Sequence, residues 1–155
     1  MKYRILSVLL FALIVSACGN ASTPASLTVS TDAPNLATEA VLVEDQASLV
    51  AALEASGATV ETGEPITQPF FSPEGNIIKV NAADVQIFEY ESAEAMENEA
   101  SQVAADGGSI GTSMVSWMDT PHFYKAGRII VLYVGSDETV LVLLESVIGP
   151  QFAGR

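Results

Sequence analysis

Basic residues, cysteine and histidine are the residue types that this 155-residue sequence has least of. Six Lys and Arg stand against 19 Asp and Glu, so the formal net charge is −13 and the pI about 4.1. This balance argues against a nucleic-acid-binding face, which needs clustered basic side chains. One Cys cannot form an internal disulfide, and one His cannot form a His-rich metal site. We therefore expect no nucleic-acid partner, no bound metal and no cofactor.

A long hydrophobic run is also missing. The longest, residues 5–15, is interrupted only by Ser7 and is too short for a bilayer span, which needs about 20 residues. It follows a short basic start and has the length of a signal-peptide core. The later apolar runs, residues 129–134 and 140–144, are shorter still, so the sequence predicts no transmembrane helix.

The apolar core is followed by Val15, Ser16, Ala17 and Cys18. An aliphatic residue, two small residues and then Cys resemble the lipobox of bacterial lipoproteins. The resemblance implies that residues 1–17 are a signal peptide and that Cys18 becomes the lipidated N-terminus, carrying palmitate or similar chains. The protein would then be anchored to a membrane rather than spanning it. The alternatives are an ordinary secretory signal with an incidental Cys, or an uncleaved anchor.

The lipobox resemblance also bears on location and charge. It implies an extracytoplasmic position in the bacterial cell envelope. Gly19 follows Cys18 in place of the Asp that commonly retains lipoproteins at the inner membrane, which favours the outer membrane if the organism is Gram-negative. Removal of the signal peptide would delete Lys2 and Arg4, leaving 4 basic against 19 acidic residues and a formal charge of −15.

Residues 18–38 have the composition of a tether. After the lipidated Cys they are mostly small and polar, with two prolines and no aromatic residue, so they cannot bury enough apolar surface to order themselves. Twenty flexible residues reach about 25 Å. An extended strand docked on the domain is the alternative. Residues 39–155 are expected to form a single domain.

Capping residues and hydrophobic periodicity predict the elements of that domain. We expect helices at 46–56, 92–105 and 138–148, with residues 140–144 of the last alternatively forming a strand. Residues 62–76 are expected to form a loop, and strands are expected at 58–61, 77–80, 85–90, 114–118, 122–125 and 128–134. These elements predict an α+β fold, an antiparallel sheet with helices packed on one face.

A pseudo-repeat of hairpin-helix units is suggested at an offset of 44 residues. Residues 80–105 align with 124–149 in the order turn, strand, cap and helix, although only four of 26 positions are identical.

Ser109 lies in a G-x-S-x-G pattern between Gly107 and Gly111. In the nucleophile elbow that this pattern marks, a strand precedes the Ser and a helix follows it. Here the predicted order is the reverse, so a glycine-rich loop joining helix to strand is the favoured interpretation. A small envelope hydrolase that uses Ser109 or His122 is kept as an alternative.

The densest aromatic stretch surrounds the only His and comprises Trp117, His122, Phe123 and Tyr124. Aromatic faces beside a titratable imidazole are typical of a patch that binds a sugar, a peptide or another small molecule. The alternative is that these are ordinary sheet residues. Acid–base chemistry by His122 with Asp119 is conceivable on paper, but Pro121 lies between them and nothing in the sequence specifies their geometry.

The acidic residues form no calcium-loop pattern, and those at 91–99 have helix spacing, so we expect a solvated face that aids solubility. Weak divalent-cation binding and docking of a cationic partner are the alternatives.

Over residues 45–154 the chain resembles small bacterial lipoproteins for which no activity is established, and this resemblance transfers no site. The sequence thus favours a non-enzymatic lipoprotein that binds a protein or small molecule. An envelope hydrolase and an envelope assembly factor are the alternatives.

Overall fold

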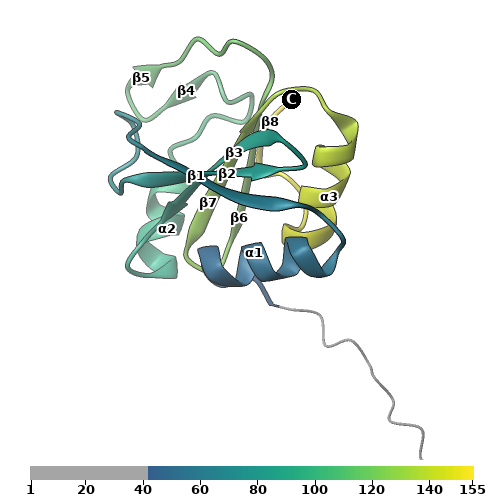
Figure 1. Ribbon diagram of the computed structural model, residues 1–155. Helices are drawn as coiled ribbons and strands as arrows, with labels where there is room; N and C mark the ends of the chain where they lie inside the picture. Colours follow the sequence, from purple (N-terminus) through teal and green to yellow (C-terminus); the bar gives the residue numbers. More distant parts are fainter. Residues whose placement is uncertain (1–41) are drawn as a thin grey trace, which may run out of the picture. The chain divides into compact units, whose positions relative to one another are not determined.

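The structure, a computed structural model, describes residues 42–155 (Figure 1). A six-stranded antiparallel sheet has the order β1-β2-β3-β7-β6-β8, and β4 and β5 form a separate two-stranded ribbon. The strands are β1 (Val60–Ile66), β2 (Gly75–Val80), β3 (Ala83–Glu89), β4 (Ser109–Ile110), β5 (Ser113–Met114), β6 (Pro121–Ala126), β7 (Ile129–Val134) and β8 (Ala153–Gly154). The helices are α1 (Gln46–Ala55), α2 (Ala93–Ala100) and α3 (Glu138–Ile148). These elements confirm the α+β class.

The signal peptide at 1–17, the tether at 18–38 and the domain start at Glu39 lie outside the described residues. From residue 42 onward, none of the helices combines the length and the hydropathy that a membrane span requires.

Local capping chemistry explains where the helices begin. The Asp45 side chain accepts a hydrogen bond from the Ser48 amide and closes a capping box at α1. Ser92 caps α2 through the Ala95 amide, and Asp137 caps α3. The first and last helices therefore confirm the predictions from sequence, and residues 140–144 are helical rather than a strand.

The middle helix ends earlier than expected. It stops at Ala100 instead of residue 105, because Val103 forms a β-bridge with Ile110 and the Ala104 amide donates to the Ser109 carbonyl. These bonds to β4, which follows within a few residues, replace the last helical turn.

Both hairpins were expected, and their turns explain their registers. The β2–β3 turn places Asn81 and Ala82 at φ +50° and +73°, which is the two-residue turn that matches strand twist. At the β6–β7 turn, Gly127 has φ +51°, and a Cβ there would lie 2.3 Å from the Glu44 Cα, so only Gly fits.

The structure differs from the predicted bounds of two other segments. The expected loop at 62–76 contains most of β1, which runs to Ile66 with a register shift between Thr62 and Pro65. The expected strand at 114–118 is reduced to the end of β5.

Helices cover both faces of the sheet, not one. The helices α1 and α3 pack against one core and α2 against the other, and Figure 1 shows α2 and α3 on opposite sides of the strands. The reason is visible in β7, where Ile129 and Val131 face one core while Ile130 and Leu132 face the other, all fully buried. A strand that is apolar on both faces requires cover on both.

The two hairpin-helix units, β2-β3-α2 and β6-β7-α3, share their element order. Their second strands are antiparallel neighbours, yet their helices lie on opposite faces. A two-fold axis normal to the sheet would place both helices on one face, so this arrangement gives the suggested repeat no support.

Candidate functional site

The sheet separates the four residues of the expected aromatic patch. His122 and Tyr124 lie on either side of Phe123 along β6. Their side chains therefore point to one face of the sheet, and the side chain of Phe123 points to the other. His122 stacks on Tyr133 and Tyr124 joins the core beneath α1 and α3. Phe123 lies in the other core, where Trp117 packs against it at 5.8 Å between ring centroids. The four residues therefore do not form one patch.

His122 is held in place by the protein itself. It is 5% exposed, and its Nε2 donates to the Gly135 carbonyl oxygen over 3.1 Å. Its Nδ1 lies 2.8 Å from the Gln151 amide, which can present oxygen or nitrogen to the ring. A hollow of about 240 Å³ that His122 and Tyr124 line lies beneath α3. Burial raises the pKa of the Tyr124 phenol, which lines the same hollow. Through the contacts with Gly135 and Gln151, both nitrogens of the His122 ring are engaged with neighbouring groups.

Ser109 and His122 are not brought together. Ser109 lies in β4, next to Ile110 of the core that contains α2. His122 points to the other face, and its hydrogen bonds go to Gly135 and Gln151. Within residues 42–155 no hydrogen bond joins the two side chains. The structure therefore does not place Ser109 and His122 together as a nucleophile and its base.

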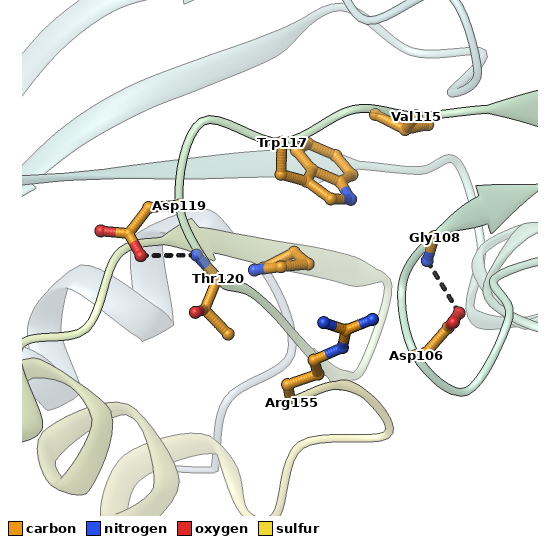
Figure 2. A pocket seen from close by; sticks show the side chains of 8 residues that line it. Asp106, Gly108, Val115, Trp117, Asp119, Thr120 and Arg155 are labelled. Atoms are coloured by element: carbon orange, nitrogen blue, oxygen red, sulfur yellow. Dashed lines mark hydrogen bonds between the residues drawn. The ribbon is translucent and has the colours of Figure 1, made fainter.

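A larger hollow than the one beneath α3 lies beside Trp117. We call it the Trp117 hollow. Its volume is about 370 Å³, and it is lined by Asp106, Gly108, Val115, Trp117, Asp119, Thr120, Pro121 and Arg155 (Figure 2). The hollow contains apolar surface from one indole, one valine and one proline, together with three charged groups. The hollow therefore offers a ligand both apolar contact and charged groups.

The indole of Trp117 is a rigid wall of the hollow. Its Nε1 donates to the Gly107 carbonyl oxygen over 2.7 Å. Phe70 meets the indole edge-on at 5.9 Å between centroids, as Phe123 does from the sheet. Gly107 allows this close approach because it has φ +69°, and a Cβ there would lie 3.0 Å from Phe123 and from Pro121. The Gly107 carbonyl oxygen, Phe70 and Phe123 thus each hold the indole in place.

The charged groups come from three separate parts of the chain. Asp106 and Asp119 each accept a hydrogen bond from a nearby backbone amide, of Gly108 and Thr120 respectively. Arg155 follows β8, and its own amide donates to the Pro121 carbonyl oxygen. Figure 2 shows its guanidinium pointing into the hollow toward Trp117, with one carboxylate to each side.

Two methionines flank Trp117 and project into solvent. Met114 is 93% exposed and Met118 is 102% exposed, the two highest values among the large apolar side chains of residues 42–155. Because Met is long, unbranched and polarizable, it adapts to different apolar partners. Residues 114–118 therefore carry two exposed, adaptable apolar side chains, one before and one after the fixed Trp117 in the chain. We call residues 114–118 the methionine segment.

The three other basic groups of residues 42–155 all lie in ion pairs. Lys79 pairs with Asp84, Lys125 with Glu97, and Arg128 with Glu89 and Asp45; distances are 2.5–3.6 Å. Across the described part of the chain, no group of three or more His, Cys, Asp or Glu side chains is placed to hold a metal ion.

Sequence reasoning missed Asp106, Arg155 and the two methionines as members of this surface. Residues 114–118 have strand-like alternation, so their side chains were assigned to a sheet. The signal that could have found the segment is the pairing of two methionines around the only tryptophan, next to a Gly-Gly turn.

Comparisons with known proteins found no match to this chain among protein-family models, curated proteins or solved structures.

Proposed function

We propose that this chain is a lipid-anchored, extracytoplasmic binding module of the bacterial cell envelope. The observation that carries the binding role is the Trp117 hollow together with the exposed methionine segment beside it. A concave site with a fixed aromatic wall, next in the chain to two exposed apolar side chains, supports a role in recognition.

The anchoring role is supported by the sequence at Cys18. Basic start, apolar core and lipobox precede the only Cys of the chain. Twenty tether residues would let the domain range about 25 Å from its anchor, so a partner could be bound at or near the membrane surface. A non-enzymatic role is favoured because the only His is engaged on both nitrogens.

The anchor is tested by Cys18→Ser in the native host. We expect the wild-type chain to incorporate labelled palmitate and to sediment with membranes, and the variant to do neither, because the thiol that accepts the lipid is gone. Met118→Ser is the matched control, since it leaves the lipobox intact and should sediment as wild type. Continued full membrane association of the Cys18 variant would refute the anchor.

The binding role is tested by a photo-crosslinking amino acid placed at residue 118 in intact cells. A discrete adduct is expected there, because Met118 projects from the proposed surface. The same group placed at the exposed Glu54 of α1 is the control and should give no such adduct. Equal crosslinking at the two positions, or none at residue 118, would contradict the binding role at this surface.

A further inference from the structure

The surface charge of the domain points to the chemistry of the partner. Of the 19 acidic residues only Asp32 and Glu39 precede residue 42, and of the six basic residues only Lys2 and Arg4 do. Residues 42–155 therefore hold 17 acidic and 4 basic side chains. A second copy of the chain, or an anionic lipid surface, would be repelled by this charge, whereas a cationic partner would be attracted.

Few of the acidic side chains are neutralised by ion pairs. Among residues 42–155, Lys79, Lys125 and Arg128 each lie in an ion pair, and Arg155 is the cation outside one. Most carboxylates of the domain therefore have no basic side chain beside them. The unbalanced negative charge extends to the hollow, where Asp106 and Asp119 face a single cation.

The chain itself shows what group the Trp117 hollow can accept. The Arg155 guanidinium points into it, between the two carboxylates and toward the indole (Figure 2). No ion pair within 4.0 Å among the described residues holds the guanidinium there; the backbone hydrogen bonds from Gly154 to Ala105 and from Arg155 to Pro121 fix only the main chain that carries it. A guanidinium stacks well on an indole, and among residues 42–155 no cation lies over the Trp117 ring, so that contact is left for an incoming cation.

The methionine segment adds an apolar requirement. Met114 and Met118 are almost wholly solvent-exposed and are chain neighbours of the hollow-lining Val115 and Trp117, and each has a long thioether side chain that can cover apolar side chains of a partner. Small cations alone would make no use of the two methionines. A peptide segment in which a basic residue is flanked by apolar residues would contact both the methionines and the hollow.

We propose, building on the binding role above, that the partner is a basic protein segment with apolar flanks. One arginine or lysine of that segment enters the Trp117 hollow, lies against the indole and is attracted by Asp106 and Asp119. The flanking apolar side chains pack on Met114 and Met118.

The test uses Trp117 as its own reporter, since the chain contains one Trp. The purified full-length chain in a non-ionic detergent is titrated with acetyl-leucyl-arginyl-leucinamide, and its tryptophan emission is followed. The matched probe replaces arginine by citrulline, which has nearly the same shape and no charge. We expect a saturable change with the arginine peptide and about fivefold weaker binding of the citrulline peptide at low salt. The difference should shrink at high salt, where charges are screened.

Variants locate the effect. The double change Asp106→Asn with Asp119→Asn keeps both side-chain acceptors and should reduce the preference for arginine to about twofold or less. Glu61→Gln with Glu64→Gln removes the same amount of charge from β1, at the far edge of the sheet. This double variant should keep most of the preference for the arginine peptide over the citrulline peptide. Arg155→Gln should tighten binding of the arginine peptide, because the resident guanidinium no longer competes.

The outcomes separate this inference from the proposed function. Equal binding of the two peptides, or equal loss in the two double variants, overturns the recognition of a cation but leaves an apolar binding role. No emission change with either peptide also overturns the inference. The binding role is then decided independently by crosslinking at residue 118.

Discussion

The role of His122 can be decided by replacing it with Ala. The change removes the Nε2 donor from the Gly135 carbonyl oxygen and the ring that stacks on Tyr133. An unpaired buried carbonyl costs about 1–3 kcal/mol, and loss of an aromatic pair about 1 kcal/mol. Gln151 is exposed, so its amide can bond to water at little cost. The free energy of unfolding should therefore fall by roughly 3 kcal/mol.

The measurement is equilibrium unfolding in urea, followed by circular dichroism, with a thermal scan beside it. For a domain of this size, 1 kcal/mol corresponds to about 4 °C in Tm, so Tm should fall by about 12 °C. The arginine-peptide affinity of the protein that remains folded should stay within about twofold of wild type, because the His122 side chain faces α3 and not the Trp117 hollow.

His122→Gln is the matched variant, since its amide can still donate toward the Gly135 carbonyl oxygen. It should recover about half of the lost stability. The reasoning fails if His122→Ala unfolds within about 0.5 kcal/mol of wild type. It fails equally if a stable His122→Ala protein loses peptide binding or crosslinking at residue 118, because His122 would then serve recognition.

Two further predictions concern the fold. Gly127→Ala should destabilise the domain by about 2 kcal/mol or more, because its Cβ would meet Glu44 at 2.3 Å; Gly57→Ala, with φ +89° and nothing within 4 Å, should cost only the backbone strain of about 1 kcal/mol. Equal losses in urea unfolding at the two glycines would show that the contact with Glu44 is not tight. Burial, with help from Glu99, raises the pKa of the Tyr90 phenol above its usual value of 10.0. The unfolded chain therefore releases this proton first, so the contribution of Tyr90 is complete below pH 10.0 and is lost as the pH rises further. Urea unfolding between about pH 9 and 12 should show a steeper loss for wild type than for Tyr90→Phe, and identical slopes would contradict it.

Local signals predicted the parts of the fold that depend on neighbouring residues. Asp45 marked the start of α1, Ser136 or Asp137 marked the start of α3, where the structure shows Asp137 as the cap, and the turn residues marked both hairpins. Each of these features is decided within a few residues of chain, because a cap or a turn satisfies its own backbone groups. Where pairing with the following strand β4 competed with the helix, as at Val103 and Ile110 after α2, the predicted helix was too long.

The candidate site depended on contacts that no local pattern contains. Asp106, Trp117 and Arg155 are far apart in the sequence and meet because β8 pairs with the edge of β6. The adjacent positions His122 and Phe123 suggested one patch, yet alternation along β6 sends them to opposite faces of the sheet.

By itself, the sequence determined the α+β class, the places where α1, α3 and the two hairpins begin, and the strongly acidic charge. It also supports the expectation of a lipid anchor at Cys18, which rests on a short contiguous motif. Only the tertiary structure decided that both sheet faces are covered, that His122 is held by Gly135 and Gln151, and that Trp117 walls a hollow. The physical reason is that caps and turns are satisfied by nearby backbone, whereas a buried face or a hollow exists only when segments distant in sequence pack together.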